Sequence, residues 1–237
     1  MSIDPITLQV IAGGLRAACE EMGAALIRSA YSANIKERHD CSTALFDAHG
    51  ELVMQAEHIP VHLGSMPDAV AAVLDLEQAP DREWILNDPY RGGTHLPDVT
   101  LIAPVFVDSE LLGFAACRAH HADVGGPTPG GMPAGSTRLE DEGVVIPPNE
   151  ATPQRLRELA DRMRFPQQRL ADFRAQRGAN RIGAARLAEL AAQMRSPRQR
   201  LADLRAQQAA NRVGSLRLLE LHERLGAEHL RAGMAEI

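Results

Sequence analysis

The stretch DVTLIAPVFVDSELLGFAACRAH, residues 98–120, decides the fold of this chain. Two runs rich in β-branched and apolar residues flank the short polar segment DSE at 108–110, which is the pattern of a β-hairpin. In an antiparallel pair that turns at Ser109, Asp98 and His120 each lie 11 positions from the turn. They are therefore predicted to face each other at one end of a sheet.

The segments before this hairpin carry further signals. A helix is predicted from Pro5 to about Ser29, because Asp4 supplies an N-cap, proline takes the first helical position and apolar residues then recur at helical spacing. Alternation over residues 42–55, around the turn at 47–50, predicts another hairpin.

Two more elements complete the first part of the chain. Ser65 before PDAVAAVLDLEQ predicts a helix over 67–78, and WILND predicts a strand over 84–88. Residues 1–150 are therefore expected to form an α+β domain with a mixed or antiparallel sheet, hairpins and flanking helices.

The last third of the chain has a different composition. Residues 151–237 are rich in Ala, Leu, Arg, Glu and Gln at helical spacing, so an all-helical segment is expected. Within it, residues 163–190 align without gaps with residues 194–221, a period of 31 with 19 of 28 positions identical. Each copy has a proline at a predicted helix start. Two copies are fewer than a solenoid needs, so the duplication is expected to form a helical hairpin that serves as scaffold.

Composition excludes several classes of protein. The 237 residues are 45% hydrophobic and 24% charged with a formal charge of −6, which argues against a disordered or fibrous chain. Only 3% are aromatic, and this scarcity together with the acidic charge argues against nucleic-acid binding. No basic signal region and no apolar span of about 20 residues is present, so neither export nor a membrane span is expected.

The cysteines and the single lysine exclude two kinds of site. Cys19, Cys41 and Cys117 are odd in number and lack CxxC spacing, which argues against a disulfide framework and a thiolate zinc site and fits a reducing cytoplasm. Cys41 and Cys117 are expected to be buried hydrophobic residues, with a nucleophile as the alternative role. Lys36 lies outside any GxxxxGK[ST] motif and no GxGxxG occurs, so ATP is expected to bind a partner.

The candidate chemistry lies in loops at the strand ends. Seven of the nine histidines fall between residues 39 and 121. His95 stands three positions before Asp98, which is expected to face His120. Imidazole nitrogens and a carboxylate converging there suit a divalent metal of the Mn, Fe or Zn type with open coordination positions. Hydrogen-bonded surface groups are the alternative interpretation of the same spacing.

Two other clusters are weaker candidates. IKERHDCS at 35–42 carries Glu37 within a charge run, which is typical of a solvated helix exit. His58 and His62 flank a proline before a predicted helix N-terminus that could receive an anion.

Four motifs together resemble a known family. IKERHDCSTALFDAHGELVMQ, NDPYRGGTHLPDV, RAHHADVGGPTPGGMP and EGVVIPP occur in an order and with a spacing similar to the N-terminal part of the hydantoinase B/5-oxoprolinase family, which also holds the large subunits of acetone and acetophenone carboxylases. The resemblance covers residues 3–148, and RSPRQRLADLRAQQAANRVGSLRLLEL resembles the helical segment that follows. Because family members are usually more than twice as long and carry one helical copy, a truncated or split product is expected.

The resemblance also implies residue roles. It implies His95, Asp98 and His120 as metal ligands, with Glu37 as a further acidic ligand. Two more residues of the HHADVGG motif, His121 and Asp123, resemble positions lining the same pocket and are expected to transfer protons.

The function implied is that of an enzyme subunit. A hydantoinase A type partner would use ATP to phosphorylate a substrate oxygen, and this chain would then open the cyclic amide or imide, such as a hydantoin or 5-oxoproline, at a divalent metal. Carboxylation of a ketone with the same ligands is one alternative. A non-catalytic assembly module is another, docking a partner through the leucines of the two helical copies: Leu170, Leu187, Leu190, Leu201, Leu218 and Leu221.

Overall fold

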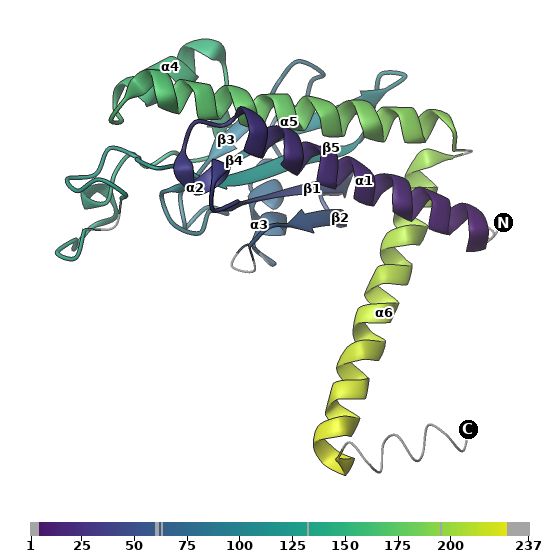
Figure 1. Cartoon of the computed structure of the whole chain (residues 1–237). Helices are drawn as coiled ribbons and strands as arrows, with labels where there is room; N and C mark the ends of the chain where they lie inside the picture. Colours follow the sequence, from purple (N-terminus) through teal and green to yellow (C-terminus); the bar gives the residue numbers. More distant parts are fainter. Residues whose placement is uncertain (1–4, 60–61, 63, 132, 195, 227–237) are drawn as a thin grey trace.

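The computed structural model describes residues 5–59, 62, 64–131, 133–194 and 196–226, so the predicted N-cap Asp4 lies outside the described part (Figure 1). Helices and strands follow one another along the chain as α1 (Pro5–Ser29), α2 (Ala33–Lys36), β1 (Cys41–Asp47), β2 (Leu52–Glu57), α3 (Met66–Ala71), β3 (Trp84–Leu86), β4 (Asp98–Val107), β5 (Glu110–His120), a 3-10 turn (Leu139–Asp141), β6 (Asn149–Glu150), α4 (Pro153–Asp161), α5 (Pro166–Ala192) and α6 (Pro197–Leu225).

The strands form one sheet of the order β2-β1-β5-β4-β3-β6. Every neighbouring pair of strands is antiparallel. Both predicted hairpins are present, β1 with β2 and β4 with β5. The predicted α+β class, with flanking helices and a helical C-terminal portion, is therefore confirmed.

The turn between β4 and β5, together with a β-bulge at Leu112, sets the register on which the candidate site depends. Asp108 and Ser109 both have positive φ, 50° and 65°, as a two-residue type I′ turn requires. The pairing places Asp98 opposite His120, which confirms the register predicted from the sequence. A slip of one residue would move every side chain of a strand to the other face of the sheet.

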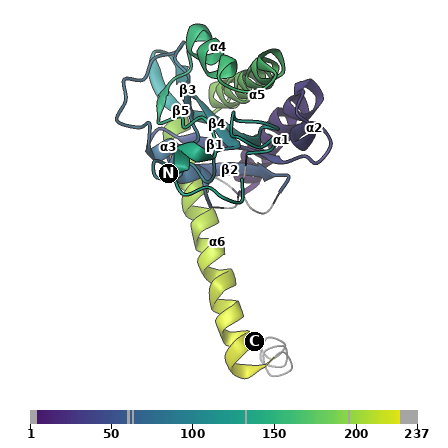
Figure 2. The same ribbon diagram turned by 90° about the vertical axis from the view of Figure 1, so that its left-hand side faces the viewer.

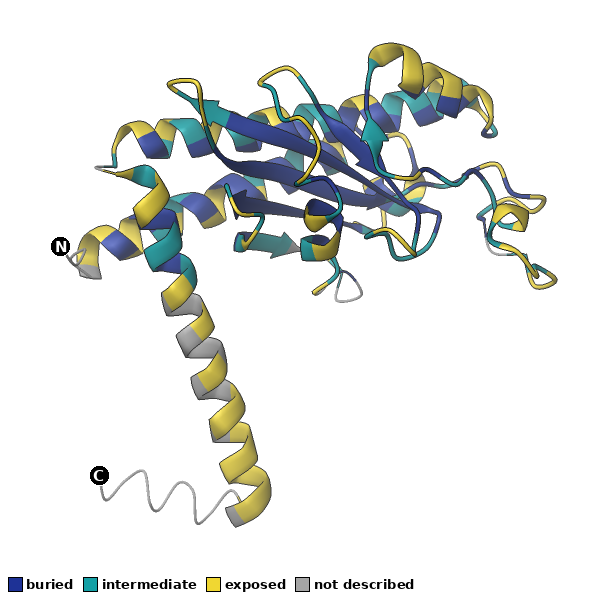
Figure 3. Ribbon diagram, turned by 180° about the vertical axis from the view of Figure 1, so that it is seen from behind, coloured by how far each residue is buried: buried dark blue, intermediate teal, exposed yellow. Residues whose placement is uncertain are grey.

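Alternation along the strands gives the sheet two buried faces. One face packs under α1 and α5, which lie side by side in Figure 1, and Leu45, Leu101 and Ala115 belong to this core. The other face carries Phe46 and Phe114 beneath the short helix α3, and Figure 3 shows its strands from behind.

Helix α3 is shorter than the sequence predicts, spanning Met66–Ala71 rather than 67–78. The hydroxyl of Ser65 does not cap the helix but donates to the carbonyl oxygen of His62. Beyond the helix, the side-chain amide of Gln78 donates to two backbone carbonyls. These side-chain hydrogen bonds satisfy backbone groups that a longer helix would have paired. The helix therefore ends at Ala71, although the helical spacing of the sequence continues to residue 78.

The predicted helix starts at Pro166 and Pro197 are confirmed, and each proline follows a residue with positive φ. Helix α5 lies over β4 and β5 beside α1, whereas α6 leaves the sheet at a steep angle after its first turns contact β1 and β2 (Figures 1 and 2). The prediction of a helical hairpin is therefore wrong for the described residues. The physical reason is that α5 uses its apolar and amide side chains to pack against the sheet.

The leucines assigned to a docking surface have different surroundings in the two helices. On α5, Leu187 is buried and Leu170 and Leu190 pack against the core, so this face stabilises the chain itself. On α6, Leu201 is buried whereas Leu221 is 41% exposed. The side chain of Leu218, also on α6, lies outside the part of the chain that the structure describes.

One core cluster holds residues from the sheet, α1, α4, α5 and the first turns of α6. It therefore crosses the predicted boundary between residues 150 and 151, and the division into two domains stays a prediction. Among the helices in the described ranges, none combines the length and the hydropathy needed to cross a bilayer.

The three cysteines are fully buried, which confirms the prediction made for Cys41 and Cys117. Burial raises the pKa of Cys19 to about 12 and also raises the pKa of Cys117. A thiol with a pKa near 12 is ionised in only about one molecule in ten thousand at pH 8, so native protein is expected not to react with a maleimide. Mass spectrometry should find no label on the native chain and three labels after unfolding in urea; one fast-reacting native thiol would contradict this.

Candidate metal centre

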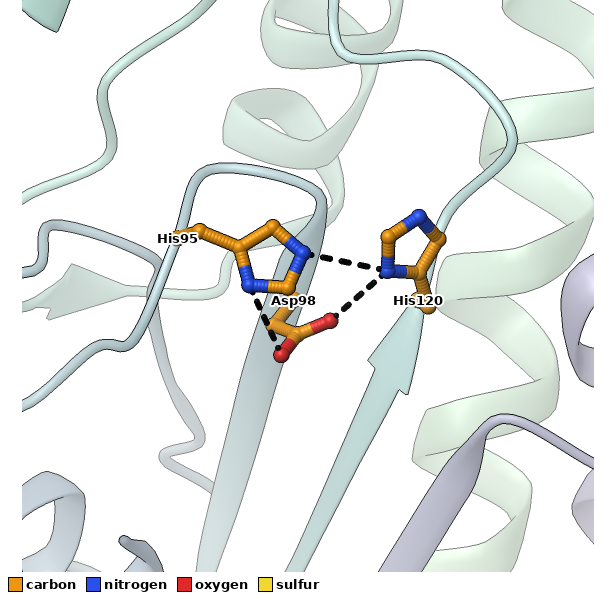
Figure 4. Close-up of side chains that lie close together, drawn as sticks. All are labelled: His95, Asp98 and His120. Atoms are coloured by element: carbon orange, nitrogen blue, oxygen red, sulfur yellow. Dashed lines mark hydrogen bonds and ion pairs between the residues drawn. The ribbon is translucent and has the colours of Figure 1, made fainter. Parts of the chain in front are cut away.

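Asp98 and His120 lie at the end of β4 and β5 because the hairpin register pairs them. By alternation along the strands they share the sheet face of Ile102 and Phe114, which packs against α3. The Nδ1 atom of His120 lies 3.0 Å from Oδ1 of Asp98, and Nδ1 of His95 lies 3.1 Å from Oδ2 of the same carboxylate (Figure 4). The two rings are also in contact, with Nε2 of His95 3.2 Å from Nδ1 of His120. The predicted group of two imidazoles and one carboxylate is therefore brought together.

The loop before β4 is held in place so that it presents His95. The backbone N–H of Asp98 donates to the carbonyl of His95, which closes a tight turn at the start of β4. Upstream, Gly92 has a φ of 90°, and a Cβ there would collide with the backbone of α3. The buried side chain of Asn87 donates to the carbonyls of Leu96 and Val144, which joins this loop to the segment after residue 143.

Two further residues, which lie just before and shortly after the first hairpin, complete the cluster. His62 is fully buried, and its Nε2 lies 3.2 Å from Oδ2 of Asp98 and 3.8 Å from Oδ1 of Asp40. The other carboxylate oxygen of Asp40 lies 3.8 Å from Nδ1 of His120. His39 bends the chain just before β1 with a φ of 55°, and Asp40 follows it directly.

Electrostatics within the cluster favour an ionised carboxylate. Burial by itself would raise the pKa of Asp98, but hydrogen bonds from His120, His62 and His95 outweigh it and lower that pKa below its usual range. The hydrogen bond to Asp98 in turn raises the pKa of His95. Ionised carboxylate beside imidazole nitrogen is the donor set that borderline divalent metals prefer.

The donor geometry fits a metal ion. Ligand atoms at the usual distance of about 2.1 Å in a tetrahedral arrangement lie about 3.4 Å apart. The donor atoms of His95, Asp98 and His120, and those of Asp40, His62 and Asp98, each form a group within 4.8 Å. In addition, Oδ1 of Asp40 is buried without a hydrogen-bond partner, so a cation or a proton donor would satisfy it.

Surrounding hydroxyl groups orient two of these donors. The Ser42 hydroxyl bonds Nδ1 of His62 at 3.0 Å, which leaves Nε2 facing Asp98. Thr94 donates to Oδ2 of Asp98 at 2.9 Å. Such outer contacts fix the orientation of ligating side chains in metal sites.

Glu37 is not brought into the cluster. It is exposed at the C-terminal cap of α2, outside both groups of donors. The acidic residue that this region contributes is Asp40, three positions later. Helix α2 ends before Glu37, and His39 then turns the chain with a positive φ. Asp40, rather than Glu37, therefore lies against the sheet.

His121 and Asp123 also lie away from the cluster, because consecutive residues of a strand point to opposite faces. His121 is buried on the α5 side, where Nε2 bonds the side chain of Gln176 at 2.9 Å and the ring contacts Phe173. Asp123 forms an ion pair of 2.8 Å with Arg164 and accepts the N–H of Gly125. Their contacts are those of structural residues, and their proposed proton transfer is not supported by this placement.

Sequence reasoning missed Asp40, His62 and Arg118 as members of this site. Arg118 is fully buried two residues before His120 on the same sheet face, and it donates to Thr100, to Ser65 and to the carbonyl of Gly92. The alternation of β5 could have indicated Arg118, since a charged residue on a buried face needs partners. His62 has no spacing to the other donors that a pattern could detect.

Comparisons with known proteins show which family the chain resembles. The family model for hydantoinase B/oxoprolinase matches residues 4–194 and 190–237. An uncharacterized protein of Methanocaldococcus jannaschii is 41% identical over 76% of this chain and 34% of its own length. The 5-oxoprolinase of Saccharomyces cerevisiae is 45% identical over 62% of this chain and 12% of its own length.

A solved structure extends the likeness to three dimensions. The crystal structure of ATP-dependent caprolactamase from Pseudomonas jessenii matches with a TM-score of 0.77 and 31% identity, covering 86% of this chain and 37% of that chain. The chain thus spans about a third or less of the curated relatives described above. Since the family model covers nearly all of its residues, the chain belongs to the hydantoinase B/oxoprolinase family.

Proposed function

We propose that this chain provides the metal centre of an ATP-dependent hydrolase that opens a cyclic amide. The observation that carries the proposal is the convergence of three imidazoles and two carboxylates at one sheet end. The relatives named 5-oxoprolinase and ATP-dependent caprolactamase support the substrate class, a ring closed by an amide bond. Ketone carboxylation at the same residues is the alternative reaction.

In this proposal His95, Asp98 and His120 hold a divalent ion such as Mn, Zn or Fe, which would supply Lewis acidity toward a substrate oxygen. Asp98 stays ionised because three histidines donate to it, so it remains an anionic donor at neutral pH. Arg118 offsets part of the negative charge that the buried carboxylate of Asp98 brings to the site.

Asp40 and His62 take the proton-transfer role in place of His121 and Asp123. Asp40 has an unpartnered buried oxygen beside the cluster, and 18% of its side chain is exposed. It can therefore accept a proton from a group in the site and release it toward solvent. His62 lies behind it, with its ring held by Ser42.

ATP is assigned to a partner subunit of the hydantoinase A type, because this sequence contains neither phosphate-binding loop motif. The expected chemistry follows from the stability of an amide: phosphorylation of its oxygen creates a better leaving group before water adds. The active assembly is then a hetero-oligomer.

The test is reconstitution of the chain with such a partner, ATP, Mn²⁺ or Zn²⁺, and 5-oxoproline, hydantoin or caprolactam in separate reactions. Ring-opened product is expected by mass spectrometry with the wild-type chain, and a loss of at least about a hundredfold is expected with Asp98→Asn. His222→Ala, on the exposed part of α6, is the matched control and should keep full activity. Full activity of Asp98→Asn would contradict the proposal, and incorporation of labelled bicarbonate into a ketone would favour the carboxylase alternative.

A further inference from the structure

Helix α6 repeats the residues by which α5 binds the rest of the protein. We call the surface that receives α5 the α5 groove; it is formed by α1, β4 and β5. The second helical copy places the same residue types 31 positions later along α6. Its outer turns nevertheless extend away from the sheet (Figures 1 and 2).

Three polar side chains anchor α5 in the groove. The carboxylate of Asp172 accepts the N–H groups of Tyr31 and Ser32 at 2.6 and 2.9 Å and the Ser32 hydroxyl at 2.6 Å. Gln176 and Asn180, one and two turns further along α5, each donate to a backbone carbonyl of β4, at 2.9 and 3.0 Å. All three are fully buried, so the groove selects these residue types.

The same three types recur at Asp203, Gln207 and Asn211. A close-packing glycine recurs as well: a Cβ at Gly183 would collide with the sulfur of Met22, and the corresponding position, Gly214, is again glycine. The sequence of α6 therefore keeps the three polar anchors and the close-packing glycine of α5.

The starts of the two helices are also alike in structure. Phe165 and Ser196, with φ of 55° and 65°, each precede the proline that begins a helix. The first turns then carry the same ion pair, Arg169 with Asp172 at 3.1 Å and Arg200 with Asp203 at 2.9 Å. Helix α6 is thus preformed in the local conformation that α5 has when it is docked.

The outer part of α6 exposes apolar side chains that α5 buries or half-buries. Val213 is 58% exposed, whereas its counterpart Ile182 packs against the core. Leu221 is likewise exposed, and its counterpart Leu190 packs against α1 near Gly14. Exposed apolar surface of this kind is stabilised by docking into a complementary groove.

Two sequence differences explain why α5, rather than α6, occupies the groove in the structure. Phe173, which is fully buried, is replaced by the smaller Leu204 in the second copy. Arg177, which pairs with Glu83, is replaced by Gln208. Each difference favours α5 over α6 in the groove, and neither blocks α6 from entering it.

From these observations we propose that α6 is a second ligand of the α5 groove and exchanges with α5 within the same chain. In the exchanged form α6 occupies the groove, its Asp203 accepts the N–H groups after α1, and α5 is displaced. Residues 163–196 would then leave and return at the same end of the groove, and an intact helix of 27 residues is about 40 Å long, so α5 bends or unfolds as it leaves. The same chain is the favoured source of the helix because this segment, once opened, keeps α6 at a high effective concentration at the groove.

Cross-linking of the full chain tests the exchange directly. Glu21 on α1 pairs with Arg186 on α5 at 2.8 Å, and Arg217 is the counterpart of Arg186 on α6. The variant Glu21→Cys with Arg217→Cys, treated with a short bismaleimide, is expected to give a cross-linked monomer. Glu21→Cys with Arg186→Cys is the positive control and should react faster, and the buried native cysteines leave the wild-type chain unlabelled.

Matched substitutions in the two copies give opposite effects if the proposal holds. Asp172→Ala weakens the docking of α5, so it should raise the rate of the Glu21–Arg217 cross-link about tenfold or more. Asp203→Ala weakens the docking of α6 and should lower that rate by a similar factor. The proposal would be overturned if the positive control reacts while the test pair gives no cross-linked monomer. Cross-linked dimer alone would overturn exchange within the chain and favour exchange between two copies.

A deletion gives a second, independent measurement. Removal of residues 163–193 leaves α6 connected to α4 by a segment equivalent to the native one. This variant should fold with α6 in the groove, and Asn211→Ala should then lower its melting temperature by several degrees while leaving that of the full chain unchanged. Equal effects in both backgrounds, or a deletion variant that unfolds, would contradict the docking of α6.

Discussion

His95→Ala and His120→Ala are each expected to lower the affinity of the chain for a divalent metal by more than about a hundredfold, because each removes a donor that the fold holds within 3.2 Å of the others. Asp98→Asn should have the largest effect, since Asp98 is the one carboxylate that contacts all three imidazoles. Elemental analysis of purified protein and competition with a chromogenic chelator measure the change.

Two controls separate this centre from adventitious binding. His222→Ala removes an exposed imidazole on α6, and Glu37→Gln removes an exposed carboxylate near the site; both should keep wild-type metal content. Asp40→Asn should lower the affinity less than Asp98→Asn. Full metal occupancy in the double variant His95→Ala, His120→Ala would exclude the assignment of these ligands.

Arg118→Met is expected to destabilise the fold by about 3–5 kcal/mol, because it removes a fully buried charge that is hydrogen-bonded to three partners. Its guanidinium donates to the hydroxyls of Thr100 and Ser65 and to the carbonyl of Gly92. Burial lowers the pKa of Arg118, and the carboxylate of Asp98 opposes that shift. The methionine would fill much of the volume but leave these acceptors unpaired.

Urea unfolding in the presence of EDTA measures this loss of stability without a contribution from bound metal. Arg91→Met is the matched control, since Arg91 is 66% exposed and its nitrogen lies 3.8 Å from Asp88. Its effect on the free energy of unfolding should stay within about 0.5 kcal/mol. An Arg118→Met variant as stable as this control would show that the buried guanidinium is not needed for folding.

The sequence was sufficient to predict those parts of the site that depend on local pattern. The Asp98–His120 pair follows from counting 11 residues on each side of Ser109, and His95 follows from its distance of three positions to Asp98. In the structure the two-residue turn alone would pair Asp98 with Ala119, and a β-bulge at Leu112 shifts the register by one residue to the predicted pair. Both deductions use the fixed geometry of an antiparallel pair, which the structure keeps.

Other parts of the site depend on contacts between distant segments. Asp40 rather than Glu37 joins the cluster because His39 turns the chain with a positive φ. A positive φ cannot be predicted from the residue type of a histidine alone. His62 joins because β1 and β5 pair, which brings the first hairpin beside the second. The opposite orientation of His121 could have been deduced from the period of two along β5.

The helical third shows a different limit. Proline positions and helical spacing predict where α5 and α6 begin, and both starts are correct. The proline start and the helical spacing that the two copies share do not indicate that only one of them lies on the sheet, and the differences at Leu204 and Gln208 favour α5 only once the groove is known. The different positions of α5 and α6 follow from the size of the groove, which accommodates one helix. The second helix therefore extends away from the sheet.

The left-handed residue before each of these helices has a consequence for how such a chain grows during evolution. The 31-residue unit begins and ends in a short connection, at Phe165 and at Ser196, rather than inside a helix. A tandem copy inserted at that boundary adds one helix and leaves every strand and its pairing unchanged. Insertions at such connections are well tolerated, so the gene could acquire a second copy without an intermediate form that fails to fold.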